Sequence, residues 1–355
     1  MERNEMLKKT AIAIALSTLF GATVVNAATL EQSDNGDFAS LYGEVGVGGY
    51  IATNPDYNYN ELYDTKGYVD DSFATMGVTG ERDKFIYRLE LDYQRRNWRG
   101  GDGEFELAID KVYIGYRFDD HQWVQAGLTD TAFDRYDHFG DYTFNESVKT
   151  REAGDQENTL KYEAAFDNLV YGVSYSYEGK HKNGDAQGDI VNGYVGWMSE
   201  YVSAVVGLEG RGGSDGESKY GKQRLAGFGM RVKTLPHLFF GVNGFVEDED
   251  LSTRKSGDVY LNYETFRNMG VTLTSKYELN KSTDIIASIN HEQYESWDVE
   301  SPNYDYTKLE PEYGKARRWG SLGVNYRPTK GIELSLEGRI GEAPEAAYAY
   351  TRIYF

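Results

Sequence analysis

The chain has 355 residues, a formal net charge of −20 at pH 7 and no cysteine. Such acidity argues against nucleic acid or an anionic membrane surface as a binding partner, because both carry negative charge themselves. Without cysteine there is neither a disulfide framework nor a thiolate metal site. The composition therefore indicates a large acidic protein that is stabilised by its hydrogen-bonded framework.

The N-terminus has the three parts of a secretory signal peptide. A short basic stretch at 6–10 precedes a largely apolar run at 11–19, and small residues end at Ala27. The apolar run is too short for the roughly 20 residues of a membrane-spanning helix. We expect cleavage after Ala27, which leaves residues 28–355 as one exported domain. Because the basic stretch begins only after Met6, both Met1 and Met6 are candidates for the translation start.

From residue 40 onwards, apolar and polar residues alternate in short segments, which is the pattern of β-strands with two different faces. Within 85–94, for example, Phe85 and Leu89 share one face while Arg88 and Glu90 share the other. No second long apolar stretch follows the signal peptide, so a helical membrane protein is excluded. The sixteen predicted strands span 40–51, 71–81, 85–96, 105–118, 122–129, 156–166, 169–179, 188–198, 201–211, 222–234, 237–249, 266–279, 283–296, 315–327, 331–341 and 346–355.

The breaks between these strands alternate between very short turns and mostly longer loops, such as 119–121 and 130–155. This alternation is typical of outer-membrane β-barrels. Proline cannot donate a hydrogen bond to a strand ladder, and all six prolines fall in predicted breaks: Pro55, Pro236, Pro302, Pro311, Pro328 and Pro344. Aromatic residues near predicted strand ends are candidates for interfacial girdles: Tyr42, Tyr50, Trp123, Trp197, Tyr201, Tyr277 and Tyr326.

Several segments resemble the general (non-specific) porin family of Gram-negative bacteria. They are LYGEVG at 41–46, DSFATMGVTGE at 71–81, VYIGY at 112–116, VQAG at 124–127, HFGD at 138–141 and ENTLKY at 157–162. The last strand ends the chain on Phe355, which resembles the C-terminal signature that the barrel assembly machinery reads. The resemblance is clearest over 41–175 and at the C-terminus. Elsewhere it lies mainly in the regular spacing of strands and breaks.

This resemblance implies a 16-stranded antiparallel transmembrane β-barrel with short periplasmic turns, long external loops and an inward-folded third loop. It also implies a homotrimer in the bacterial outer membrane, surrounded by lipid and lipopolysaccharide. The third loop would span about 130–155, and its charged residues would narrow the pore opposite a basic wall, although a solvated acidic loop is the simpler alternative. The candidate constriction residues are Asp130, Asp134, Arg135, Asp137, Asp141 and Glu146.

The basic residues that similar porins carry on the pore wall are missing here. Glu44, Thr75 and Leu128 stand at the matching positions of strands one, two and five, and only Arg151 in the loop keeps a basic role. By alternation, three other basic residues fall on lumen-facing positions: Arg88, Lys111 and Arg117. These residues either rebuild a basic wall or form a structural network with nearby carboxylates, and the sequence does not decide between the two.

The function that follows is a porin for the passive diffusion of small hydrophilic solutes and ions, without a cofactor, a metal or covalent chemistry. The lost basic positions and the acidic composition predict a preference for cations. A substrate-specific porin is the main alternative, because four aromatic residues lie in the third loop: Tyr136, Phe139, Tyr142 and Phe144. An adhesin and an outer-membrane enzyme are more distant alternatives, since the five histidines form no recognisable Ser/His or Asp/His arrangement.

Overall fold

The computed structural model describes residues 28–32, 36–52, 67–95, 105–144, 148, 150, 152–180, 184, 186–213, 222–255, 259–299, 312–313, 316–343 and 345–355. Within these ranges, no helix is long and apolar enough to cross a membrane.

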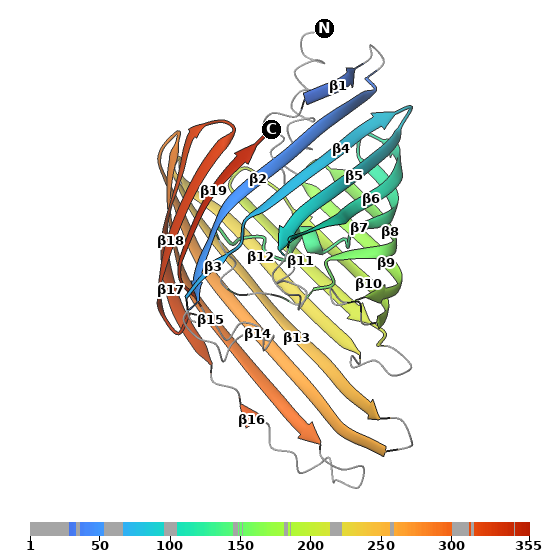
Figure 1. Cartoon of the computed structure of the whole chain (residues 1–355), viewed down its shortest axis with the longest axis vertical. Coiled ribbons are helices and arrows are strands. Elements are labelled where there is room, and N and C mark those ends of the chain that lie inside the picture. The colour runs from blue at the N-terminus through green and yellow to red at the C-terminus, as the bar shows by residue number, and fades with distance from the viewer. Residues whose placement is uncertain are drawn as a thin grey trace.

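Sixteen antiparallel strands form one closed barrel (Figure 1). They are β2 (Phe38–Ala52), β4 (Phe73–Arg82), β5 (Phe85–Arg95), β6 (Phe105–Asp119), β7 (Gln122–Asp130), β8 (Asp155–Phe166), β9 (Leu169–Lys180), β10 (Ala186–Trp197), β11 (Val202–Arg211), β12 (Gln223–Leu235), β13 (Leu238–Lys255), β14 (Val259–Asn280), β15 (Thr283–Val299), β17 (Arg317–Thr329), β18 (Ile332–Gly341) and β19 (Glu345–Tyr354).

Three short strands extend this sheet. β1 (Ala28–Gln32) pairs with the start of β2, and β3 (Gly67–Asp70) pairs with the end of β2 just before β4 begins. β16 (Glu312–Tyr313) pairs with β15 ahead of β17.

The barrel closes where the last strand pairs with the first. Nine residues of β19 pair with β2, and Gly43 and Phe355 exchange two backbone hydrogen bonds of 2.8 and 3.0 Å. Closure matters because lipid cannot satisfy the backbone groups of an open sheet edge. The predicted 16-stranded antiparallel barrel is therefore confirmed.

The distribution of apolar and polar side chains over the two faces of the strands is the reverse of that in a soluble protein. On β11, the apolar Val206 and Leu208 are 52% and 62% exposed on the outer surface, whereas Glu209, pointing inward, is 5% exposed. The same alternation of exposed apolar and buried polar residues runs around the whole barrel. An apolar outer surface around a polar lumen is the arrangement of a barrel that crosses a membrane.

Short turns gather at the end of the barrel that also holds the termini of the sheet (Figure 1). The β4–β5 turn consists of Asp83 and Lys84 alone, with φ of 49° and 70°, as expected for the two-residue turns that match strand twist. Turns of two residues also join β6 to β7, β8 to β9, β12 to β13, β14 to β15 and β17 to β18. We assign this end to the periplasm, because outer-membrane barrels keep their short turns there.

The predicted strand boundaries lie within about two residues of the observed ones, except on three neighbouring strands. β13 continues to Lys255, β14 begins at Val259 and β15 continues to Val299. Figure 1 shows these three strands reaching beyond the rest of the barrel at the end opposite the termini. The prediction was too short there because it was limited to the length that crosses a bilayer.

Proline placement needs one correction. Pro328 lies inside β17, near its end, where the register with β18 shifts between Tyr326 and Thr329. An irregular ladder of this kind tolerates a residue without an N–H group. Pro236 lies in the β12–β13 turn as predicted. Four prolines lie outside the described residues: Pro55, Pro302, Pro311 and Pro344.

Two of the predicted girdle aromatics were assigned to the wrong face. Tyr42 and Trp123 share the lumen-facing phase of their strands and are 9% and 2% exposed, and Tyr50 is half-buried. The remaining four candidates lie exposed on the outer surface near the periplasmic turns: Trp197, Tyr201, Tyr277 and Tyr326.

We predict that replacing Gly43 with valine weakens barrel closure. A β-carbon at Gly43 would overlap the ring of Phe355 and the backbone of Thr75, and overpacking of this kind costs about 1–3 kcal/mol. The unfolding midpoint in urea, followed by the heat-dependent gel shift of the folded barrel, should fall. Gly338→Val is the control, because nothing lies within 4 Å of a β-carbon there; equal effects of the two changes would contradict the prediction.

Candidate functional site: the constriction of the barrel

The third external loop joins β7 to β8, and its described residues, 131–144, 148, 150 and 152–154, lie inside the barrel. Near its start, the backbone N–H of Ala132 donates to Ser174 Oγ on β9 at 2.9 Å. Further along, Asn243 Nδ2 on β13 donates to the carbonyl oxygen of Asp137 at 2.6 Å. Both wall residues face the lumen, so the loop runs along the inner wall rather than outward.

The loop reaches as far as β18 and then returns. The N–H of Phe144 donates to Glu337 Oε2 on β18 at 3.3 Å. On the way back, the N–H of Ala153 donates to Glu209 Oε2 on β11 at 3.1 Å. These contacts cover the inner wall from β9 to β18 and leave the lumen faces of β19, β2, β4, β5 and β6 free of them. We call these five lumen faces the uncovered wall.

Glycines on the covered wall provide the room that the loop fills. A β-carbon at Gly207 would overlap the ring of Phe133, and one at Gly229 would overlap the backbone of Phe139. We call the wall glycines that contact the loop in this way the glycine track: Gly207, Gly227, Gly229, Gly241, Gly270 and Gly323. The track allows the loop backbone to approach the sheet closely.

The aromatic residues of the loop face the wall. Tyr136, in the single 3-10 turn η4 (Asp134–Tyr136), lies 4.4 Å from Tyr194, measured between ring centroids. The guanidinium of Arg231 on β12 lies 4.3 Å from the ring centre of Phe139, a cation–π contact. Tyr142 lies close to the same Arg231 and to Lys276, and Phe144 packs over Gly323. The aromatics therefore anchor the loop.

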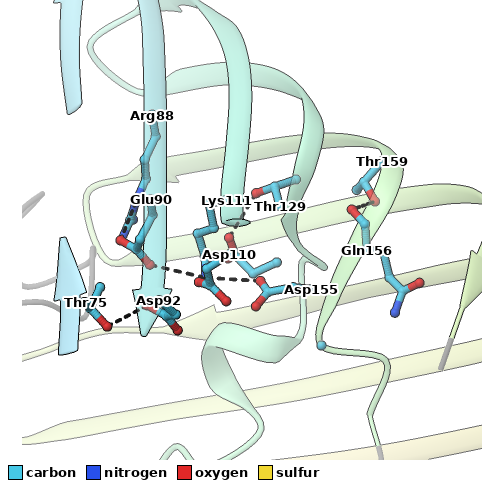
Figure 2. Close-up of polar contacts among 12 residues, drawn as sticks. Thr75, Arg88, Glu90, Asp92, Asp110, Lys111, Thr129, Asp155, Gln156 and Thr159 are labelled. Atoms are coloured by element: carbon cyan, nitrogen blue, oxygen red, sulfur yellow. Dashed lines mark hydrogen bonds and ion pairs between the residues drawn. The ribbon is translucent and has the colours of Figure 1, made fainter. Parts of the chain in front are cut away.

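The uncovered wall carries a cluster of carboxylates, which we call the acidic cluster: Glu90 and Asp92 on β5 and Asp110 on β6. Oxygen atoms of all three lie within 4.8 Å of one another. Figure 2 shows these side chains converging beside Lys111 and Asp155. Asp92 accepts a hydrogen bond of 2.6 Å from Thr75 Oγ1 and forms no ion pair among the described residues.

The basic residues of the uncovered wall are each shared with carboxylates. Arg88 pairs with Glu90, and Lys111 Nζ lies 2.8 Å from Asp110, 3.1 Å from Asp155 and 3.9 Å from Glu90. One lysine among three carboxylates leaves an excess of negative charge. The wall opposite the loop is therefore not basic, and the residues that the sequence offered for a basic wall belong to a mixed network.

The other two basic residues of this wall are also paired. Arg117 Nε lies 3.1 Å from Glu81 near the periplasmic end, and Arg352 Nε lies 3.5 Å from Glu44. At the other positions matched to porin arginines, Thr75 serves as a hydrogen-bond donor to Asp92, and Leu128 is half-buried opposite Val112.

Asp110 is the member of the acidic cluster that sequence alternation missed. In the β5–β6 ladder, Glu90 pairs with Lys111 and Leu91 pairs with Ile109, so Asp110 is an extra residue. Such a bulge turns Asp110 and Lys111 toward the same side. The sequence carries a signal of it, because the exposed apolar positions of β6 change from odd to even numbers between Ile109 and Val112.

The predicted loop charges are engaged locally. Asp130 pairs with Lys161 at 2.7 Å, and Arg135 lies 3.4 Å from Glu163. Asp141 accepts hydrogen bonds of 2.8 and 2.9 Å from Thr143. Glu146 and Arg151 lie outside the described residues.

Asp137 and His138 form the one Asp–His contact found in the described part of the loop. Asp137 Oδ2 lies 2.7 Å from His138 Nε2 and 3.2 Å from Thr150 Oγ1, which donates to it. In a catalytic triad the hydroxyl would instead contact the histidine. Here the hydroxyl of Thr150 donates to the carboxylate of Asp137.

Asp134 and Glu152, on the two arms of the loop, hydrogen-bond to each other. Burial, with a smaller contribution from the carboxylates of Asp137 and Asp130, raises the pKa of Asp134 to about 6. Burial also raises the pKa of Glu152 well above its ordinary value, with Asp134 as the next cause. The pair therefore retains a proton near neutral pH and gains negative charge as the pH rises.

The structure resembles solved outer-membrane barrels at low sequence identity. A loop-deletion mutant of OmpT, an outer membrane protein of Vibrio cholerae, matches 90% of this chain and 99% of its own with a TM-score of 0.65 and 14% identity. OmpF of Salmonella typhi in complex with daunomycin matches 92% and 100% with a TM-score of 0.63 and 10% identity. A mutant of the Rh. blastica porin matches 89% and 100% with a TM-score of 0.58 and 15% identity. No family model and no curated protein sequence matches the chain.

At these identities the likeness establishes the shared fold. The closed sheet, the apolar outer surface and the inward loop define a porin-like β-barrel of the bacterial outer membrane.

We predict that filling the glycine track displaces the loop and widens the pore. Gly229→Val places a side chain where the backbone of Phe139 lies, so the single-channel conductance of the variant should rise clearly above that of the wild type. Gly210→Val is the control, because a β-carbon at Gly210 meets nothing within 4 Å. A Gly229 variant that folds and conducts like the wild type would contradict the role of the track.

We predict that any cation preference of the pore weakens as the pH falls through about 6. Asp134 is protonated below its raised pKa and ionised above it, so its charge is present at pH 7.5 and lost at pH 5. The reversal potential in a salt gradient should shift toward zero over this range. Asp134→Asn should reduce the shift, whereas an identical pH profile in the variant would assign the titration to other groups.

Proposed function

We propose that the protein is a general porin that conducts small hydrophilic solutes and ions by passive diffusion and prefers cations. The observation that carries this proposal is the charge of the uncovered wall. Among the described residues, each cation on this wall is shared with a carboxylate, and Asp92 accepts a hydrogen bond from a hydroxyl but forms no ion pair.

The size of electrostatic interactions indicates that ion selectivity depends on charges close to the ion path rather than on the net charge of the protein. Two unit charges 4 Å apart interact by about 1 kcal/mol in bulk water and by about 4 kcal/mol at an effective dielectric constant of about 20. Charges beyond a Debye length of roughly 8 Å are screened at physiological salt. The net charge of −20 is therefore a poor guide to selectivity, whereas a carboxylate of the acidic cluster beside the ion path acts directly.

A general pore is supported over a substrate-specific one by the loop aromatics. A sugar path would need aromatic faces along the route of the solute. Tyr136 is 5% exposed against Tyr194, and Phe139 lies under Arg231. These rings are occupied in anchoring the loop.

We propose no catalytic activity, cofactor or metal for this site. Glu90 and Asp110 of the acidic cluster are already paired with Arg88 and Lys111, which weakens the case for a bound cation. The Asp137–His138 pair has its hydroxyl neighbour on the carboxylate, which weakens the case for a hydrolase. Release of product from peptide or lipid substrates by the purified protein would overturn this part of the proposal.

The proposed assembly is a homotrimer that is exported with a signal peptide, inserted by the barrel assembly machinery and surrounded by lipopolysaccharide. An in-vitro folded OmpT of Vibrio cholerae, with 13% identity to this chain, is described in a trimer form. Phe355 supports the insertion route, because it hydrogen-bonds to Gly43 where the closing pair of strands meets.

We predict that neutralising the acidic cluster lowers cation selectivity. The double variant Asp92→Asn with Asp110→Asn should reduce the ratio of potassium to chloride permeability severalfold, because the cations Arg88 and Lys111 are then balanced by Glu90 and Asp155 and the excess of negative charge is lost. The measurement is the reversal potential of the purified mature protein in planar bilayers.

Asp189→Asn provides the matched control for this experiment. Asp189 lies exposed on the outer face of β10, so the same chemical change there should leave the permeability ratio unaltered. An unchanged ratio in the double variant, with normal conductance, would exclude the acidic cluster as the selectivity site.

A further inference from the structure

The outer surface of the barrel has a depression that spans the external ends of β17 and β18 and the middle of β15. It measures about 540 Å³ and lies over β15, β17 and β18. Gly320 of β17 pairs with Ile289 on one side and with Ile340 on the other. The two isoleucines are 70% and 78% exposed, so they form the apolar walls of a notch whose floor is a residue without a side chain.

Two cationic or ionisable side chains border this notch on its external side. His291 and Arg318 are the next outward-facing residues of β15 and β17, and they are paired across the ladder. Arg318 Nε lies 3.4 Å from His291 Nδ1, and Arg318 forms no ion pair among the described residues. Glu342 also lies beside it, and its Oε2 accepts a hydrogen bond of 3.1 Å from the backbone N–H of Arg318.

The position of this arginine in the membrane favours an anionic partner. Arg318 is the second residue of β17, at the end opposite the periplasmic turns, and therefore lies at the level of the outer head groups. A guanidinium beside an apolar surface is costly unless it reaches water or an anionic group. Its fork of donors fits phosphate oxygens in a bidentate manner.

We propose that the notch and its rim bind the phosphorylated glycolipid of the external leaflet, with a phosphate at Arg318 and His291 and an acyl chain over Gly320. The proposal rests on the orientation of the barrel in the proposed function and names the residues that hold the surrounding lipopolysaccharide. The basic groups lie on the external side of the apolar walls. This order matches a lipid whose phosphates lie on the external side of its acyl chains.

The test is native mass spectrometry of the purified mature protein in detergent with added diphosphorylated lipid A. The wild type should retain at least one lipid per subunit. Arg318→Ala with His291→Ala should lower the affinity at least tenfold and remove one retained lipid. Gly320→Phe should have a similar effect with both basic groups intact, because it fills the notch. Glu342→Gln should strengthen binding.

Arg82→Ala is the matched control, because Arg82 is an exposed arginine at the periplasmic end of β4; it should leave lipid retention unchanged. Equal binding of dephosphorylated lipid A or of phosphatidylglycerol would overturn the proposal, as would wild-type retention in the double variant. Conductance is recorded for every variant and should stay at the wild-type value, since all these residues except Arg82 face lipid. Lipid retention and conductance test the two proposals separately. Absent lipid binding with normal conductance would contradict this inference alone, and retained lipid without conductance would contradict the proposed function alone.

Discussion

The obligation to pair every backbone N–H and C=O group in the membrane is the constraint on which the rest of this structure depends. Lipid offers no hydrogen bonds, so the sheet must close, and β19 must pair with β2. Closure in turn fixes which face of each strand is the lumen. It also places Gly43 beside Phe355, so that the first and last strands of the barrel meet over the same short stretch of ladder.

A closed barrel of this size would be an open tube without its third loop. The loop is held inside by wall side chains that satisfy its backbone, such as Asn243 and Ser174, and by glycines that let it approach the sheet. The loop is thus a second layer on one half of the wall. What remains of the lumen borders the other half, where carboxylates outnumber the cations they hold. In the proposed function, this asymmetry of the wall connects the fold to the selectivity.

Much of the fold follows from alternation and turn lengths, because a membrane imposes both. The face assignment of Arg88 and Glu90 was correct for that reason. The alternation did not identify Asp110, since a bulge changes the phase in mid-strand. It placed Tyr42 and Trp123 in a girdle although their strands direct them inward. The glycine track could not be predicted for a different reason: its six glycines are spread over five strands, and only the inward path of the loop brings them together. Beyond the membrane, no lipid limits strand length, so the ends of β13, β14 and β15 were unpredictable.

The central claim is that charge on the uncovered wall makes this barrel a cation-preferring pore. The most direct measurement is the zero-current potential of the wild-type mature protein in a planar bilayer with a tenfold gradient of potassium chloride. A potential of the sign that marks potassium as the more permeant ion, together with stepwise conductance increments, is the predicted result. A clear preference for chloride would contradict the account, and stable insertion without conductance would contradict the porin itself.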